Sequence, residues 1–158
     1  MRRKTKVELI GELFAAVRAN QLATDKMDDA AARGMGVNRT DSRALDIIER
    51  LGPVTAGKLA ADAGLTSGAA TAVIDRLVEK GYVRRIADSS DRRRVLIEKT
   101  AKLEEVSQRF YGPLATGAVP LVDKFSITEI EAIIRFLGLG TELVEGRVAE
   151  LTEERARG

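Results

Sequence analysis

The side chains in this sequence that are best suited to chemistry are clustered arginines. Arg92 to Arg94 follow Asp91 directly, and Arg84 and Arg85 lie just before them. Between residues 76 and 99 there are eight Lys or Arg and four Asp or Glu, so this window carries +4 while the whole chain carries +2. Guanidinium groups pair their N–H donors with phosphate oxygens. The localised charge therefore indicates a surface that binds nucleic-acid phosphates.

Composition argues against most other chemistry. The chain has no Cys and no His, which removes disulfides, thiolate metal sites and the usual general base. No P-loop, nucleophile elbow or paired-carboxylate motif is present in the sequence. We therefore expect no enzyme, no metal and no cofactor. The sequence also has no apolar run of membrane-spanning length and no signal-peptide pattern, so we expect a cytoplasmic protein without a membrane partner.

Two short helical patterns separated by a tight turn precede the arginines. Leu59 and Ala60 are the apolar positions of the first helix, and Thr55 is placed to cap it. Gly64 supplies the turn, because glycine takes a positive φ without a Cβ clash. Thr66 is a good cap for the second helix. This order predicts a helix-turn-helix.

The second helix is expected over Thr66–Lys80, with one apolar face. The apolar positions at helical spacing are Ala69, Val73, Ile74 and Leu77. Its start presents small groups to base edges, namely Ser67, Gly68, Ala69, Thr71 and Ala72. Arg76 lies nearly three turns from the start, so we expect it to contact phosphate rather than a base.

After Gly81 the pattern changes to that of short β-strands. Two β-prone runs, 82–86 and 94–97, flank a turn-forming segment with two Asp and two Ser. They pair best as a two-stranded hairpin. The plain alternative for its arginines is a solvated hairpin whose charges serve solubility, but their position after a helix-turn-helix favours nucleic acid. For Asp91 the alternative is a turn-forming residue, and both roles can hold together.

The run DRLVEKGYVRR, followed closely by DSSDRRRVLIEKT, resembles the multiple-antibiotic-resistance regulator (MarR) family of winged-helix repressors. The resemblance is densest from about Asn38 to Thr100 and includes NRTDSRALDII. It implies a homodimer that binds double-stranded DNA, at a pseudo-palindromic operator, with the recognition helix in the major groove and the wing Ala87–Arg94 in the minor groove. A small aromatic effector is also implied, and the sequence assigns no residues to it.

The same resemblance implies roles for wing and helix residues. Asp91 steadies the basic side chains, Arg93 enters the minor groove, and Arg92 contacts phosphate. Thr71 and Arg76 correspond to positions that face a base edge and a phosphate. Ala72 stands where several relatives carry a long polar side chain, and no proline follows Asp88, so we expect little direct base reading and more dependence on DNA shape.

Helical patterns flank this region on both sides. Lys4–Ala19 reads as an amphipathic helix, followed either by a second helix over Lys26–Arg33 or by its own continuation as one long bent helix. Thr40 or Asp41 is expected to cap a helix over Ser42–Arg50.

After the wing, Thr100 is expected to cap a helix that Pro113 bends, with an irregular second half around Gly117 and Pro120. A capping box at residues 126–129 opens the last helix. In that helix a seven-residue seam suits packing of helix on helix. The seam consists of Ile130, Ile134, Leu137, Val144, Val148 and Leu151.

The sequence thus predicts a mainly α protein with a small β wing of two or three strands. Its expected domains are N-terminal dimerisation helices at 1–37, a winged helix-turn-helix at 38–100 and C-terminal dimerisation helices at 101–158. The expected function is a dimeric DNA-binding regulator, as a repressor released by a small ligand. The alternative is a winged-helix module that binds protein.

Overall fold

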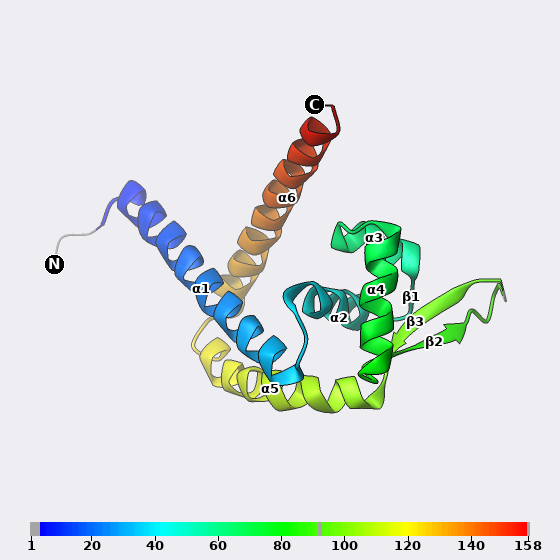
Figure 1. Cartoon of the computed structure of the whole chain (residues 1–158). Coiled ribbons are helices and arrows are strands. Elements are labelled where there is room, and N and C mark those ends of the chain that lie inside the picture. Colours follow the sequence, from blue (N-terminus) through cyan, green and yellow to red (C-terminus); the bar gives the residue numbers. More distant parts are fainter. Residues whose placement is uncertain (1–3, 92, 158) are drawn as a thin grey trace. The chain divides into compact units, whose positions relative to one another are not determined.

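The computed structural model describes residues 4–91 and 93–157, and most of them are helical (Figure 1). A small antiparallel sheet with strand order β1-β3-β2 completes the fold. The chain divides into two compact units, Met1–Phe110 and Tyr111–Gly158. The predicted fold class, mainly α with a small β wing, is confirmed.

The first helix is a single one. α1 runs from Lys6 to Met35, so the continuous interpretation of the N-terminal region holds. Thr5 caps it through a reciprocal capping box with Glu8, and it ends at Gly36, whose φ is 67°. Only Ala31 and Ala32 are buried along it, so the apolar stripe of its first half is exposed.

The second helix begins earlier than the sequence predicted. α2 spans Arg39–Leu51, and the side chain of Asn38 caps it by accepting the N–H of Asp41 at 2.9 Å. The expected cap at Thr40 or Asp41 is wrong, because both residues already lie inside the helix. Asp41 is instead a buried residue of α2 that forms an ion pair with Arg76.

The helix-turn-helix is present as predicted. β1 (Val54–Thr55) leads into α3 (Ala56–Ala63), which Thr55 caps and which ends at Gly64 with φ 67°. α4 (Ser67–Glu79) follows, capped by the Thr66 hydroxyl, which accepts the N–H of Ala69 at 3.2 Å. Its expected span from 66 to 80 therefore includes the two capping residues.

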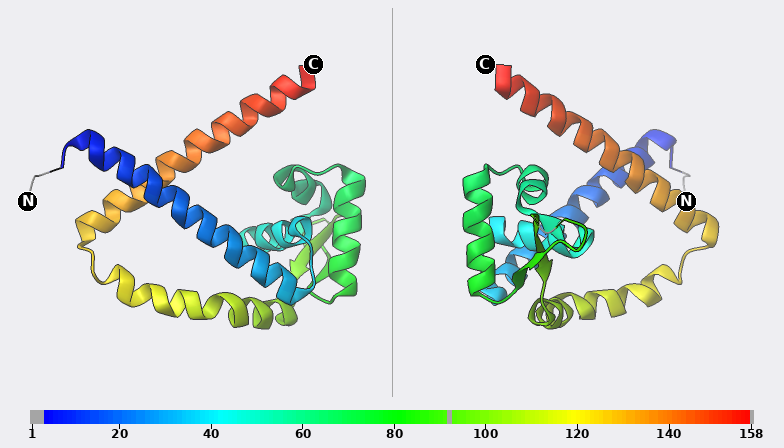
Figure 2. Two further views of the ribbon diagram at one scale, coloured as in Figure 1. Left: turned by 60° about the vertical axis from the view of Figure 1, so that its left-hand side comes forward. Right: turned by 90° about the vertical axis from the view of Figure 1, so that its right-hand side faces the viewer.

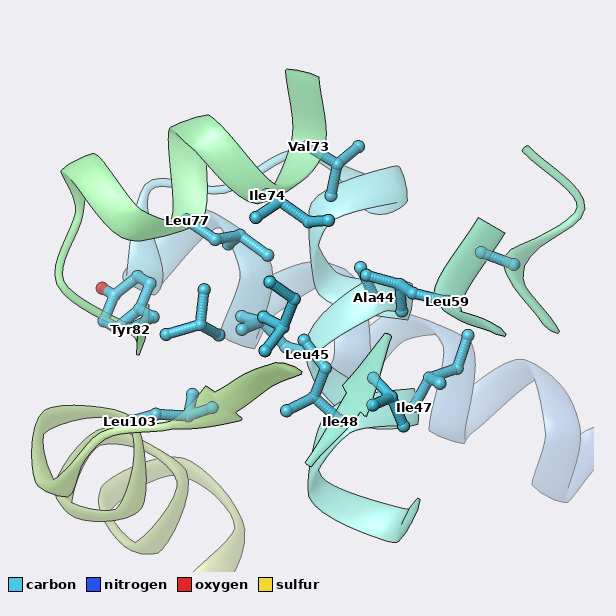
Figure 3. Close-up of a cluster of buried hydrophobic side chains, with 14 residues drawn as sticks. Ala44, Leu45, Ile47, Ile48, Leu59, Val73, Ile74, Leu77, Tyr82 and Leu103 are labelled. Carbon is cyan, nitrogen blue, oxygen red and sulfur yellow. The ribbon is translucent and has the colours of Figure 1, made fainter. Parts of the chain in front are cut away.

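A compact apolar core joins these helices to the sheet (Figure 3). Val73, Ile74 and Leu77 of α4 point into this core, which also contains Leu45 and Ile48 of α2. The buried face of α4 begins with Ala70, at 0% exposure, and not with Ala69, which is exposed. Ala69 was placed wrongly on the apolar face, because residues 70, 73, 74 and 77 share one side of a 3.6-residue helix.

The hairpin consists of β2 (Val83–Ala87) and β3 (Val95–Lys99), paired antiparallel from Val83 opposite Lys99 to Ala87 opposite Val95. It projects from the helices in Figure 1. β1 pairs with the other side of β3, so the sheet has three strands. The expected wing of two or three strands is therefore confirmed, with β1 as the third strand. Sequence patterns do not locate β1 itself, because a strand of two residues has no detectable period.

Two contacts attach the end of α1 to the rest of the first unit. The hydroxyl of Tyr82 donates a hydrogen bond to the carbonyl of Met35 at 3.0 Å. Gly34 lies against the ring of Phe110, and a Cβ on Gly34 would collide with that ring. The absence of a side chain at Gly34 therefore permits this close approach.

The last two helices are long and largely exposed. α5 spans Ala101–Val122 and contains Pro113 and Pro120, so the expected irregular second half is wrong. Exposure explains the tolerance, because water can bond the carbonyl groups that a proline leaves unpaired. α6 spans Ile127–Arg157 and opens with the predicted capping box of Ser126 and Glu129. In the part of the chain that the structure describes, no helix is long and apolar enough to cross a bilayer.

Candidate nucleic-acid interface

The start of α4 presents a face of small side chains to solvent. Ser67, Gly68, Ala69 and Thr71 are all exposed, and we call these four residues the contact face. Packing sets this orientation, since Ala70, Val73, Ile74 and Leu77 occupy the opposite side of the helix. In both views of Figure 2, α4 lies along the outer side of the cluster formed with α2 and α3. The helix can therefore meet a large partner along its length.

Two members of the contact face have distinctive surroundings. The Thr71 hydroxyl donates to the carbonyl of Ser67 at 3.0 Å, which leaves its methyl group and its lone pairs for an outside partner. Gly68 has ordinary helical geometry, and a Cβ built on it meets no atom within 4 Å. The fold gains nothing from a glycine there, because alanine is the better helix former.

Arg76 is held by a buried carboxylate. Its Nη2 lies 2.5 Å from Oδ1 of Asp41 and its Nε lies 3.3 Å from Oδ2. Asp41 is 2% exposed, whereas the Arg76 side chain is 43% exposed. The hydrogen bond to Asp41 is the main cause that raises the pKa of Arg76 above its ordinary value. The predicted phosphate contact of Arg76 stays a prediction. Sequence reasoning missed the role of Asp41, because an aspartate near a helix start looks like a cap.

Asp91 shapes the wing through the backbone. Its carboxylate accepts the N–H of Arg93 at 3.0 Å, and its carbonyl accepts the N–H of Arg94 at 2.8 Å. These are the local bonds of a turn-forming aspartate. They fix the direction in which the exposed Arg93 leaves the turn. The predicted contact of Arg92 falls outside the described residues.

Among the described residues of the wing, Asp88 is the acid that lies beside a basic side chain. Its carboxylate accepts the N–H and the hydroxyl of Ser90 at 2.8 and 2.7 Å, and it lies 3.7 Å from Nε of Arg94. The Ser90 hydroxyl is the first cause that lowers the pKa of Asp88. Stability from these bonds is present above the ordinary carboxyl pKa and is lost as the pH falls through the lowered value. Sequence reasoning did not single out Asp88.

Most arginines of the basic window are already ion-paired. Arg84 pairs with Glu98 and Arg85 with Asp75 of α4, each at 2.5 Å. Arg93 has no ion-pair partner among the described residues. The count of basic residues in the sequence therefore overstates the free positive charge, and of the two wing arginines that the structure describes, Arg93 rather than Arg94 is the one free to meet an external phosphate or groove.

Comparison with known proteins relates this chain to one family of transcriptional regulators. The model of the MarR family matches residues 37–95. The chain is 35% identical over 124 residues to YcgE of Bacillus subtilis (strain 168), which is described as an uncharacterized HTH-type transcriptional regulator. The matched region covers 78% of this chain and 80% of that protein. A MarR family protein from Bacillus stearothermophilus has the same fold, with a TM-score of 0.64, 20% identity and coverage of 89% and 99% of the two chains.

A solved protein–DNA complex is also among the similar folds. A mutant of S. aureus MepR bound to an oligodeoxyribonucleotide superposes with a TM-score of 0.55 at 17% identity, over 90% of this chain and 99% of that one. At this level of identity the likeness concerns the fold alone.

Proposed function

Because the chain belongs to the MarR family of transcriptional regulators, we propose that it is a homodimeric repressor that binds a pseudo-palindromic DNA operator. The observation that carries this proposal is the contact face, which is exposed, made of small groups and held by a buried face on the same helix. An α-helix fits the major groove of B-DNA, and the N-terminal residues of a recognition helix meet the base edges.

The proposed contacts divide between helix and wing. Ser67, Gly68, Ala69 and Thr71 lie against base edges, and Arg76 uses the guanidinium N–H groups that Asp41 leaves free to reach a phosphate. The exposed Arg93 enters the minor groove beside α4, and Arg92 contacts phosphate. The DNA bound by the MepR mutant supports a nucleic-acid partner for this fold. A small aromatic ligand, for which we assign no residues, releases the repressor.

The exposed apolar side chains of the terminal helices are the evidence for a dimer in this proposal. Many large apolar side chains of α1 and α6 are exposed in the single chain, which ordinarily marks a protein interface. They include Val7, Phe14 and Leu22 of α1, and Leu137, Val144 and Val148 of α6. A two-fold dimer places two copies of α4 in successive major grooves, about 34–36 Å apart.

A binding selection with a randomised duplex pool tests the proposal. The expected result is a recovered sequence with two related half-sites, bound with an affinity that falls steeply as salt increases. The same assay separates DNA binding from the alternative of a protein-binding winged helix. That alternative is favoured if duplex DNA is not retained even at low salt.

Arg93→Ala is expected to weaken binding to the recovered duplex by about 1–3 kcal/mol, the range of a good groove contact. Its thermal unfolding should be unchanged, because Arg93 is exposed and has no ion-pair partner among the described residues. Arg50→Ala is the control, since Arg50 is an exposed arginine in the last turn of α2, outside the proposed contacts. Titration of labelled duplex measures both. Unchanged affinity for Arg93→Ala would move the minor-groove role to Arg92 or Arg94.

Gly68→Ala is expected to change stability and binding in opposite directions. The alanine should raise the free energy of unfolding by up to about 1 kcal/mol, because it favours the helix and its Cβ meets no neighbouring atom. It should weaken operator binding, because the DNA backbone or bases then approach α4 less closely. Chemical denaturation and duplex titration measure the two effects. A variant that is more stable and binds as tightly as the unaltered protein would contradict close approach at Gly68.

A further inference from the structure

The ion pair between Arg76 and Asp41 connects the proposed recognition helix to α2. It is bidentate, with separate bonds from Nη2 and Nε to the two carboxylate oxygens. A bidentate arginine pair fixes direction as well as distance. Because Arg76 lies in the second half of α4, the pair restrains the rotation of the helix about its own axis at the end away from the Thr66 cap.

Folding alone does not explain a charge pair at this position. Asp41 shares its side of α2 with the buried Ala44, Leu45 and Ile48. The pair is buried at its Asp41 end only, since the Arg76 side chain is 43% exposed. Replacing buried charges by apolar residues of similar volume is often neutral or stabilising. An apolar residue at position 41 would therefore serve the stability of this core as well. An apolar residue would lack the directional hydrogen bonds to Arg76. The best-attested role of buried ionic groups in proteins is to fix the register of packed helices.

The geometry of a helix makes a rotational restraint important for reading bases. Side chains extend about 5–6 Å from the helix axis, so a rotation of about 10° moves their tips by about 1 Å. Hydrogen-bond lengths vary by only about 0.5 Å between good donors and acceptors. A small rotation of α4 would thus be enough to misplace Thr71 or Gly68 against its base pair.

We propose that Asp41 is a positioning residue for DNA recognition. Packing of the apolar face sets which side of α4 faces solvent, and Asp41 holds Arg76 and thereby restrains the remaining small rotation of the helix, so that the contact face is presented to the bases. This inference rests on the proposed function, since it specifies how the recognition helix is oriented. Asp41 itself is buried and does not touch DNA. Its effect on binding is transmitted through Arg76.

Asp41→Asn distinguishes positioning from simple electrostatics, because the two predict opposite signs. Removing a negative charge near DNA by itself tightens binding to every duplex. If Asp41 positions α4, affinity for the selected duplex falls about tenfold, in the range of one lost base contact. Affinity for a non-matching duplex of the same length stays equal or rises. Asp46→Asn is the matched control, because Asp46 is exposed on the same helix and its change in charge is identical.

Arg76→Lys provides a second, independent test of the positioning role if Asp41→Asn does not fold. Lysine keeps the charge but cannot bridge both carboxylate oxygens in a fixed plane. If Asp41 positions α4 through Arg76, Arg76→Lys should lower the affinity for the selected duplex relative to the affinity for the non-matching duplex, as expected for Asp41→Asn. The salt dependence of binding should stay unchanged. A role in phosphate binding alone predicts nearly unchanged affinity for both duplexes.

Thermal unfolding of each variant separates loss of fold from loss of orientation. The positioning role is overturned if Asp41→Asn, or Arg76→Lys where the former does not fold, retains the full preference for the selected duplex. If the unaltered protein shows no preference among duplexes, the proposed function itself is wrong. The two failures are therefore distinguishable in one set of titrations.

Discussion

Replacing both Leu137 and Val144 by Glu is expected to convert the proposed dimer to monomers and to lower affinity for the proposed operator about 100-fold or more. Both side chains belong to the seven-residue seam of α6 and are 54% and 63% exposed in the single chain. Buried carboxylates at a helix interface have no partner there, so association becomes unfavourable. A monomer reaches one half-site only and loses the effective concentration that links two binding events, which is worth about 10²–10⁴.

Sedimentation at micromolar concentration and duplex titration measure the two effects. Leu139→Glu with Leu143→Glu is the matched comparison, because these leucines are 61% and 76% exposed on the same helix but lie outside the seam. We expect this second pair to remain dimeric. Dissociation by both pairs would assign a wider face of α6 to the interface. A folded, monomeric unaltered protein would refute the dimer.

Leu77→Ala is expected to lower the free energy of unfolding by about 2–5 kcal/mol, the usual loss for a leucine removed from a packed core. Leu77 is 0% exposed and belongs to the cluster that holds α4 against α2 and the sheet. A loss of this size is a large part of the stability of a typical domain. DNA binding should fail in parallel, because the orientation of the contact face depends on this packing.

Chemical denaturation at fixed protein concentration measures the change, since the stability of a dimer depends on concentration. Leu114→Ala is the control, because Leu114 of α5 is 55% exposed in the single chain. A Leu77→Ala protein that unfolds like the unaltered one would show that α4 is held by other contacts.

Local signals made much of the fold predictable from the sequence. The caps at Thr55, Thr66 and Ser126 and the turn at Gly64 depend on residues within a few positions of one another, so they are visible in a short window. The exposed start of α4 followed from helical phase, apart from the one-residue error at Ala69.

The features that the sequence did not reveal are of two kinds. Some depend on contacts between residues far apart in the sequence, and others depend on which of several nearby residues takes a given role. Asp41 meets Arg76 across 35 positions, and no local pattern pairs them. Two acids of the wing, Asp88 and Asp91, have similar sequence surroundings, but only the fold shows that Asp88 is the one beside Arg94. At the start of α2, Asn38, Thr40 and Asp41 were all chemically able to cap, and the backbone made the choice.

The small side chains of the contact face also affect how this protein can evolve. Ser67, Gly68, Ala69 and Thr71 are exposed, and the core lies on the other side of α4. Exposed helix positions accept alanine, arginine, glutamine and lysine with differences in helix propensity well below about 1 kcal/mol. In the proposed complex, a single substitution there introduces a longer side chain beside the bases while leaving the fold nearly as stable as before. Under the proposed function, the DNA sequence preferred by a lineage of such proteins is therefore free to diverge one base pair at a time, without compensating changes in the core.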